Sequence, residues 1–247
     1  MTTETGKEIV DAGQLWPESA EEVLEKAVLL RRSTSGGNAD VYVLEREGCR
    51  YLVKSYLHHS WLSKMLFSAI AVANEWRLLK RLEKEGFTYA PRPVARLGKW
   101  VVITEYIQGS GPLLGKRHYR DREMPPREFF SELLEAYRKL HDLGIVHGDV
   151  RRQNILVGED GRPRIIDWAT GTIAGESMPK WRVVSRWFHN VQGVSDFSSL
   201  ARIVKCFYPE LITHEMEAQN SRFLKIGRYI RQKLYRPLKH CFRNKKR

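Results

Sequence analysis

The sequence has few of the features that mark secreted, zinc-binding or membrane-spanning proteins. Its 247 residues include three cysteines, which lie far apart and form no CxxC pair. A disulfide framework or a zinc site is therefore not expected, and a reducing cytoplasm is favoured. No apolar run follows the polar N-terminus, so we expect no signal peptide. The longest apolar stretch, residues 61–73, is shorter than the ~20 residues that a membrane span needs.

Acidic residues are missing from the C-terminal segment, where most of the net charge of +13 is concentrated. Residues 222–247 contain eleven Lys or Arg and no Asp or Glu, so the rest of the chain carries only +2. Apolar residues recur there every three or four positions, which predicts a basic amphipathic helix. Such a helix favours binding to an anionic membrane surface. The alternatives are packing against the chain's own domain and, less favoured, nucleic-acid binding.

Short β-rich runs occupy the first part of the chain, and amphipathic helices dominate the second. The predicted strands are residues 27–30, 41–44, 51–54, 100–107, 155–157 and 165–166. The predicted helices include residues 75–82, 129–140 and 195–208, the last with Ser195 as its N-cap. The first three strands are separated by glycine turns, which indicates an antiparallel meander. We therefore predict an α+β fold whose two parts join near Gly109.

Residues 145–157, Ile-Val-His-Gly-Asp-Val-Arg-Arg-Gln-Asn-Ile-Leu-Val, carry the strongest chemical signal. Asp149 lies in a loop, Asn154 follows five residues later, and Asp167 ends a predicted strand eighteen residues after Asp149. This layout lets the Asp149 carboxylate accept a substrate proton while Asn154 and Asp167 bind Mg²⁺ through oxygen atoms. The alternative is that both aspartates only cap turns, which aspartate does often. The complete pattern is much harder to obtain by chance than either aspartate alone.

These residues resemble the HxD(x4)N catalytic loop and the DFG metal-binding motif of the protein-kinase-like superfamily. The resemblance covers roughly residues 28–210. It implies a two-lobed fold with a β-rich N-lobe and a reduced, mainly helical C-lobe, and it implies ATP and Mg²⁺ as cofactors. The expected parts are an N-terminal extension at 1–20, the N-lobe at 21–108, the C-lobe at 109–221 and the basic tail at 222–247.

Upstream residues match the phosphate-binding parts of the same superfamily. Gly36 and Gly37 lie in a segment that resembles a degenerate nucleotide loop, whose backbone amides would cover the phosphates. Lys54 matches the strand lysine that binds the α- and β-phosphates, and Glu75 matches its ion-pair partner on the next helix. Taken alone, a lysine at this position is more commonly an exposed strand lysine.

The resemblance also assigns a hinge and two supporting residues. It places adenine against the backbone of Glu105 and Ile107, with Thr104 behind the base. Asp196 matches the buried aspartate that braces the catalytic loop, although a helix cap is an alternative role. His147 is expected to support the same loop rather than to exchange protons.

Departures from ordinary protein kinases indicate an atypical enzyme. Gly148 replaces the usual arginine, and Trp168-Ala169 replaces Phe-Gly. Only 28 residues separate Asp167 from Asp196, and they contain no Ala-Pro-Glu motif for peptide docking. These traits are typical of RIO-type kinases, Bud-type kinases and bacterial lipopolysaccharide-core kinases.

Three functions are compatible with these residues. The first is an ATP- and Mg²⁺-dependent kinase that phosphorylates a sugar hydroxyl of a membrane glycolipid, such as lipopolysaccharide core, at the cytoplasmic face of the cell membrane. The second is a RIO- or Bud-like Ser/Thr protein kinase or ATPase, with a protein hydroxyl as acceptor. The third is a nucleotide-binding pseudokinase scaffold. The complete set of Lys54, Asp149, Asn154 and Asp167 argues against the third.

Overall fold

The structure is a computed structural model in which contacts divide the chain into two units. The first unit is Met1–Ile107 and the second is Gln108–Arg247. The described residues are 16, 18–33, 38–59, 68–108, 111–120, 122–176 and 182–213, with residues 182–186 and 188 described as backbone only. Gly36, Gly37 and the predicted basic tail at 222–247 lie outside the described residues.

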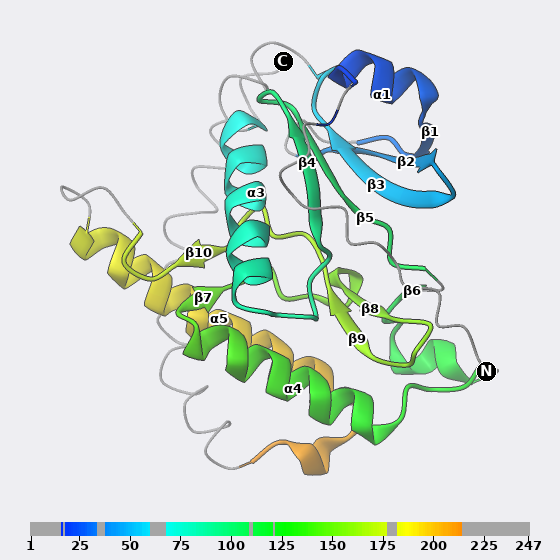
Figure 1. Cartoon of the computed structure of the whole chain (residues 1–247). Coiled ribbons are helices and arrows are strands. Elements are labelled where there is room, and N and C mark those ends of the chain that lie inside the picture. Colours follow the sequence, from blue (N-terminus) through cyan, green and yellow to red (C-terminus); the bar gives the residue numbers. More distant parts are fainter. Residues whose placement is uncertain are drawn as a thin grey trace, which may run out of the picture. The chain divides into compact units, whose positions relative to one another are not determined.

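An antiparallel five-stranded sheet forms the first unit, in the order β1-β2-β3-β5-β4 (Figure 1). Its strands are Val28–Arg31 (β1), Asp40–Arg46 (β2), Cys49–Ser55 (β3), Pro93–Leu97 (β4) and Val101–Glu105 (β5). Glu47 and Gly48 join β2 to β3 with φ angles of 52° and 74°. Two successive positive φ angles are typical of the tight turns that suit twisted hairpins. The predicted meander and the following strand are therefore confirmed.

Two helices pack against opposite faces of this sheet. They are Ala20–Lys26 (α1) and Ala69–Lys84 (α3). Ile103 belongs to the core cluster that contains Leu24 of α1, whereas its neighbour Val102 lies in the cluster that contains Val72 of α3. Lys54 is paired with Val102 in the β3–β5 ladder. Because paired residues lie on the same face of a sheet, Lys54 faces α3.

Helix α1 is missing from the sequence prediction, which begins its ordered part with a strand at 27–30. The Ser19 hydroxyl accepts a hydrogen bond from the Glu22 amide at 3.2 Å, and the Glu22 carboxylate accepts one from the Ser19 amide at 2.7 Å. This reciprocal capping box is visible in the sequence as Ser-x-x-Glu. A seven-residue helix is too short for apolar periodicity to reveal it, so the cap was the only usable signal.

The second unit contains two long helices and two small antiparallel sheets. The helices are Arg127–Asp142 (α4) and Arg182–Phe207 (α5), with 3-10 turns at Lys116–Tyr119 (η2), Arg152–Asn154 (η3) and Pro209–Leu211 (η5). The sheets are Gly111–Pro112 (β6), Ile155–Val157 (β8) and Pro163–Ile165 (β9), and Ile145–Val146 (β7) with Thr172–Ile173 (β10). Phe130 of α4 stacks on Phe207 of α5, with ring centroids 4.7 Å apart. The helix predicted at 129–140 and the strand at 155–157 are confirmed.

Helix α5 begins thirteen residues before the predicted start. Ser195 lies inside this helix, so its prediction as an N-cap is wrong, and Asp196 is not a helix cap either. Residues 182–194 contain no proline and a single glycine, Gly193, so the sequence holds no strong helix breaker there. The Ser-Asp pair resembled a cap, but the flanking residues continue the helix.

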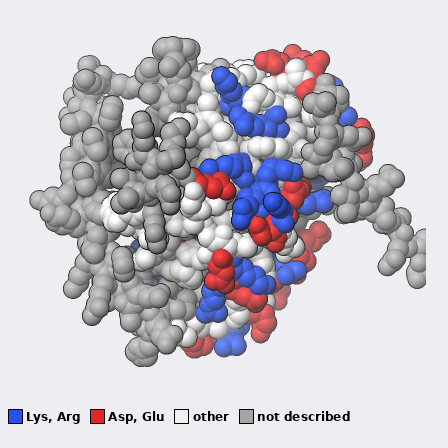
Figure 2. Space-filling view, turned by 60° about the vertical axis from the view of Figure 1, so that its left-hand side comes forward, with Lys and Arg blue, Asp and Glu red and all other residues white. Residues whose placement is uncertain are grey.

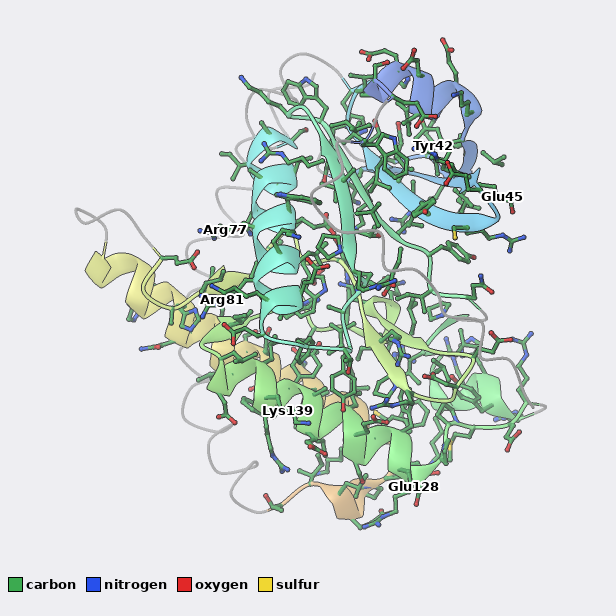
Figure 3. The ribbon with its side chains drawn as sticks, in the orientation of Figure 1. Tyr42, Glu45, Arg77, Arg81, Glu128 and Lys139 are labelled. Carbon is green, nitrogen blue, oxygen red and sulfur yellow. The ribbon has the colours of Figure 1, made fainter. Side chains whose placement is uncertain are left out.

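Charged side chains cover the outer surfaces of both units. Figure 3 shows Arg77 and Arg81 projecting from α3, and Lys139 from α4. On the face seen in Figure 2, Lys and Arg side chains lie among Asp and Glu side chains, as expected of a body with little net charge. Among the described helices, none is both long and apolar enough to cross a membrane. A β-rich first unit and a mainly helical second unit confirm the predicted α+β, protein-kinase-like fold.

Candidate active site

The buried carboxylate of Asp196 holds the loop that carries Asp149. Asp196, on α5, is 1% exposed. It accepts hydrogen bonds from the backbone amide of His147 at 2.7 Å and from that of Gly148 at 3.1 Å. A buried carboxylate is costly unless such donors satisfy it. The contact is the one expected of a bracing aspartate, and it ties the loop to α5 across 48 residues of sequence.

The His147 side chain fixes the same loop from the inside. Its ring is fully buried, and Nε2 lies 3.0 Å from the carbonyl oxygen of Ile166, while Nδ1 accepts the Asp149 amide at 3.2 Å. A ring with its proton on Nε2 satisfies both contacts. The ring also packs edge-on against buried Trp168, with centroids 4.7 Å apart. Both nitrogens are therefore engaged in holding the backbone beside Asp149 and Asp167.

Gly148 is required by two features of its surroundings. Its φ is +79°, which side chains rarely adopt, and a Cβ there would lie 2.7 Å from the Thr170 carbonyl oxygen and 2.7 Å from Gln192 Nε2. Gln192 Nε2 also donates to the Thr170 carbonyl at 3.2 Å. The segment that follows Asp167 thus crosses directly over Gly148. The arginine that ordinary protein kinases carry at this position has no room in this fold.

Asp149 and Asn154 lie together, as their spacing predicts. Asn154 is 5% exposed, and its Nδ2 donates to the Asp149 carbonyl oxygen at 2.9 Å and to Asp149 Oδ2 at 3.1 Å. The Asn154 carbonyl accepts the Ile166 amide at 2.9 Å, which joins this loop to the strand before Asp167. The Asp149 side chain is 34% exposed, so its carboxylate remains accessible from outside the loop.

Arg151 is a site residue that the sequence prediction missed. Its Nη2 lies 2.7 Å from Asp149 Oδ2 and 3.8 Å from Asp167 Oδ2. One guanidinium therefore bridges the two carboxylates, and its side chain is 51% exposed. The sequence places this arginine two residues after Asp149, but basic residues are common and nothing in the spacing distinguishes Arg151 from Arg152.

Asp167 adopts a backbone conformation that is unusual for a residue with a side chain. Its φ is +71°. A positive φ costs free energy for a residue with a side chain, and such residues often occur at functional sites. At Asp167 it turns the chain sharply between β9 and β10. The next residue, Trp168, is fully buried and its Nε1 donates to the Ile165 carbonyl at 3.0 Å. The tryptophan anchors this turn, so its place in the motif is explained by packing.

Oxygen ligands for a divalent cation are available in this loop. With Nδ2 of Asn154 donating to Asp149, its side-chain oxygen is left for a cation, and the Asp167 carboxylate is 38% exposed. Amide and carboxylate oxygens suit Mg²⁺, which is usually held by one or two protein ligands together with waters and substrate phosphates. No group of three His, Cys, Asp or Glu able to hold a metal occurs among the described residues. The donor set fits Mg²⁺ bound together with a nucleotide better than a metal bound by protein alone.

Lys54 and Glu75 form an ion pair within the first unit. Lys54 Nζ lies 2.6 Å from Glu75 Oε1, and the two side chains are 15% and 6% exposed. The pair joins β3 to α3, because Lys54 lies on the face of the sheet that α3 covers. Burial lowers the local dielectric, so removing either partner would leave a poorly solvated charge. Glu75, rather than Glu83 or Glu85, is therefore the partner of Lys54.

The predicted hinge lies at the end of β5. Thr104 is 5% exposed, and the backbone amides of Glu105 and Tyr106 donate to the carbonyls of Arg92 at 3.0 Å and Arg50 at 3.2 Å. The Glu105 carboxylate accepts from the Arg92 amide at 3.0 Å and Arg92 Nε at 2.9 Å. Ile107 ends the first unit. Two of the hinge amides are thus already engaged in hydrogen bonds within the first unit. Fewer backbone groups therefore remain for hydrogen bonds to an adenine base.

Polar residues of α5 fix the segment after Asp167, and sequence reasoning missed them. The Thr172 hydroxyl lies 2.8 Å from His189 Nδ1 and donates to Gln192 Oε1 at 3.0 Å. Burial lowers the pKa of His189 below its usual 6.5, and the neighbouring His141 lowers it further, while Asp196 opposes the shift. The charged form of His189 is therefore disfavoured. Because the single Thr172 hydroxyl proton goes to Gln192 Oε1, the neutral ring satisfies the contact by donating from Nδ1 to the Thr172 oxygen. No periodic pattern could have revealed contacts across 17 to 20 residues.

Sequence comparison assigns the chain to a family. A model of the RIO domain matches residues 45–181, more than half of the chain. The chain belongs to the RIO domain family. The match includes Lys54, Glu75 and the loops of Asp149 and Asp167, and it ends before Asp196. The RIO-like part of the predicted resemblance is confirmed, and with it membership of the protein-kinase-like superfamily, whereas the narrower likeness to lipopolysaccharide-core kinases stays a prediction.

Curated relatives of this RIO-domain chain are protein kinases. It is 23% identical over 152 residues to CBL-interacting serine/threonine-protein kinase 19 of Arabidopsis thaliana, covering 61% of this chain and 28% of that protein. It is 43% identical over 153 residues to sperm motility kinase 3A of Mus musculus, which covers 59% of this chain and 28% of that protein. A probable inactive serine/threonine-protein kinase of Dictyostelium discoideum is 29% identical over 112 residues, covering 45% and 9%. The chain thus spans less than a third of the length of these relatives.

Tyr137, on α4, contributes a buried hydroxyl beside the loop. It is fully buried, its ring lies 6.4 Å from that of His147, and its hydroxyl has no hydrogen-bond partner within the described part of the chain. Burial raises the pKa of Tyr137 well above its usual 10, and the negative charges of Asp196 and Asp149 raise it further. The unpartnered Tyr137 hydroxyl therefore destabilises the folded state, and the packing around His147 offsets this loss.

We predict that Gly148→Ala destabilises the protein more than Gly161→Ala. Both glycines have a positive φ, +79° and +72°, but a Cβ on Gly161 meets nothing within 4 Å. The positive φ alone should cost about 1–2 kcal/mol in the Gly161 variant. The contact with Thr170 should raise the cost to about 3–4 kcal/mol in the Gly148 variant. Urea unfolding of both variants checks this, and equal losses would refute the close approach.

We predict that Tyr137→Phe leaves the protein as stable at pH 7 or stabilises it by about 1 kcal/mol, because it removes an unsatisfied buried hydroxyl. The raised folded pKa means that stability is fully present below pH 10 and is lost above it, where only the unfolded tyrosine ionises. Above pH 10, the free energy of unfolding of the wild type should therefore fall by about 1.4 kcal/mol more per pH unit than that of the variant. Urea unfolding between pH 7 and 11 measures both effects. Tyr208→Phe is the control, because the Tyr208 hydroxyl donates to the Pro125 carbonyl at 3.3 Å and its loss should destabilise.

Proposed function

We propose that this RIO-domain chain is an ATP-dependent phosphotransferase that moves the γ-phosphoryl group to a hydroxyl acceptor. The observation that carries the proposal is the grouping of Asp149, Asn154 and Arg151 in one braced loop, with Asp167 Oδ2 3.8 Å from the same guanidinium. A carboxylate, an amide oxygen and a second carboxylate are the groups that phosphoryl transfer requires near the reacting phosphate. The kinase relatives support the same class of reaction.

In the proposed reaction, Asp149 orients the acceptor hydroxyl and takes its proton. The hydroxyl oxygen forms a bond to the γ-phosphorus while the bond to the β–γ bridging oxygen breaks, and ADP leaves with that electron pair. Asn154 holds the Asp149 carboxylate through the 3.1 Å hydrogen bond. Arg151 can follow the transferring charge, since its exposed guanidinium reaches both Asp149 and Asp167. Electrostatic stabilisation of this kind carries much of the rate in loose phosphoryl transfer.

Asn154 and Asp167 would hold Mg²⁺, which supplies charge neutralisation on the β- and γ-phosphates when bound. Lys54 would bind the α- and β-phosphates, and the Glu75 carboxylate, 2.6 Å away, fixes its ammonium. The proposed adenine contacts are the backbone of Glu105 and Ile107. Gly36 and Gly37 would cover the phosphates. Asp196 and His147 act as positioning residues, because their contacts go to the loop backbone.

The acceptor that we favour is a sugar hydroxyl of a membrane glycolipid at the cytoplasmic face. Support comes from the short stretch between Asp167 and Asp196, which lacks the peptide-docking motif of protein kinases, and from the basic segment 222–247. A Ser or Thr hydroxyl of a protein is the second candidate. The RIO family match and the serine/threonine kinase relatives favour that alternative.

We predict that Asp149→Ala lowers phosphoryl transfer by about 10²–10⁴-fold, because the acceptor loses its base and its orientation. Nucleotide affinity should change by less than about threefold, since Asp149 acts on the acceptor. Transfer is measured with radiolabelled ATP and affinity by titration calorimetry. Glu159→Ala, which removes an exposed carboxylate in the β8–β9 turn, is the control and should be fully active. Undiminished turnover in the Asp149 variant would remove the proposed role.

The two acceptor classes can be separated with the wild-type chain. We expect radiolabel from ATP to enter purified lipopolysaccharide at least about tenfold faster than casein or the proteins of a cell extract. The Asp149 variant is the blank for both acceptors. A preference for protein would favour the Ser/Thr kinase alternative. Nucleotide binding without transfer to any acceptor would instead support a pseudokinase scaffold.

A further inference from the structure

A run of exposed basic residues lies beside the candidate catalytic loop in the second unit. Residues 111–120 contain Lys116, Arg117 and Arg120 and no Asp or Glu, and these three side chains are exposed. Together with Arg152, they form what we call the basic platform: Lys116, Arg117, Arg120 and Arg152. Asp121 and Glu123 follow this run directly, so residues 116–123 hold four Lys or Arg against two acidic residues and keep a local net charge of +2.

The backbone that carries the basic platform is fixed against the catalytic loop. Strand β6 pairs with β8, which directly follows Asn154, as Figure 1 shows. Buried Leu113 donates its amide to the Ile155 carbonyl at 2.8 Å. The Tyr119 hydroxyl accepts the Leu114 amide at 3.1 Å, and the Tyr119 ring packs on Phe207 with centroids 6.0 Å apart. The backbone that carries these exposed cations is therefore fixed by pairing and packing.

Arg152 joins the platform to the candidate active site. A Cβ on Gly115 would collide with Arg152 Nη1 and lie 3.4 Å from His118 Nδ1, so the guanidinium lies directly over this glycine. Arg152 follows Arg151, whose own guanidinium is 2.7 Å from Asp149. Two successive arginines thus contact different parts of the second unit, Arg151 the proposed catalytic base and Arg152 the glycine that precedes η2.

The platform arginines differ from their neighbours in lacking carboxylate partners. Within the described residues, no Asp or Glu pairs with Arg117, Arg120 or Arg152. In contrast, Arg162 pairs with Glu132, and Arg164 pairs with Asp160 at 2.7 Å. Lys116 is partly used as well, because its Nζ donates to the carbonyl of Phe207 at 3.4 Å. Within the described residues, the guanidinium groups of Arg117, Arg120 and Arg152 are therefore not neutralised by a carboxylate, which favours their binding an anion.

We propose that the basic platform binds a phosphate group that the acceptor already carries, so that the enzyme acts on a phosphorylated glycolipid. The inference rests on the proposed function, since it extends the acceptor side of the Asp149 site. Planar guanidinium groups match phosphate oxygens in pairs and favour a phosphate dianion over a single carboxylate. The phosphate is held by Arg117, Arg120 and Arg152, and the hydroxyl lies at Asp149.

The test compares the full chain with the triple variant Arg117→Gln, Arg120→Gln, Arg152→Gln. The control is Arg138→Gln, an exposed arginine of α4 outside the platform. The acceptor probes are lipopolysaccharide in detergent micelles, before and after removal of its phosphates with aqueous hydrofluoric acid, and casein before and after phosphatase treatment. The KM and kcat for each acceptor and the KM for ATP are measured at low and high salt.

We expect the wild type to have a KM about 30-fold lower for phosphorylated than for dephosphorylated lipopolysaccharide, at about threefold for each of the three arginines. The triple variant should lose this difference, Arg138→Gln should keep it, and high salt should reduce it in the wild type. Equal KM values for the two lipopolysaccharides, or equal effects of the triple and control variants, would overturn the proposal. An arginine-dependent preference for phosphorylated casein over lipopolysaccharide would also overturn it, in favour of an acidic protein acceptor.

Failure of the proposed function can be recognised separately. If the wild type transfers phosphate to no acceptor, its binding to vesicles that contain phosphorylated lipopolysaccharide is measured by co-sedimentation. Binding that the triple variant loses and Arg138→Gln retains would support the platform as a phosphate site without turnover. Binding that is unchanged in the triple variant would overturn the platform itself.

Discussion

The Asp196 carboxylate sets the geometry on which the candidate site depends. It is buried under the loop and accepts the backbone amides of His147 and Gly148. A carboxylate that leaves water loses several kcal/mol of solvation, so the two amides must stay in place for the folded state to tolerate it. This requirement fixes the backbone two residues before Asp149. The position of the proposed catalytic base is therefore set by an electrostatic constraint on a residue that never meets substrate.

Helix α5 holds both chemically important loops at once. Asp196 supports the loop of Asp149, and one turn earlier Gln192 holds Thr170, in the segment that follows Asp167. The two loops touch at Gly148, where a side chain would collide with the Thr170 carbonyl. Because one helix supports both, a displacement of α5 would move the proposed base and the proposed metal ligand together. Close packing thus requires a glycine at position 148, and the same packing leaves no room there for an arginine.

Sequence reasoning succeeded where local spacing decides structure. The meander and α4 follow from alternation and helical periodicity, which act over a few residues. The pairing of Lys54 with Glu75 came instead from the resemblance to protein kinases, because no local pattern links residues 21 positions apart. It failed for α1, which is too short to show a period, and for the start of α5, where a Ser-Asp pair imitated a cap. It also missed Arg151 and the Gln192 contacts, because side-chain contacts between distant segments leave no periodic trace.

The arrangement of charge around Asp149 explains why Arg151 belongs to the site. Asp149 and Asp167 both carry carboxylates that reach the same guanidinium, at 2.7 and 3.8 Å. Two like charges this close repel each other unless a cation lies between them. Asn154 and Asp167 would hold Mg²⁺, whose charge would add to that of Arg151 in offsetting this repulsion. Arg151 is 51% exposed and shared between two carboxylates, whereas the Lys54 side chain is 15% exposed and lies 2.6 Å from Glu75. Displacing the exposed Arg151 from its carboxylates therefore costs less than displacing Lys54 from Glu75, so Arg151 is the cation of the proposed mechanism that can respond to a change in charge.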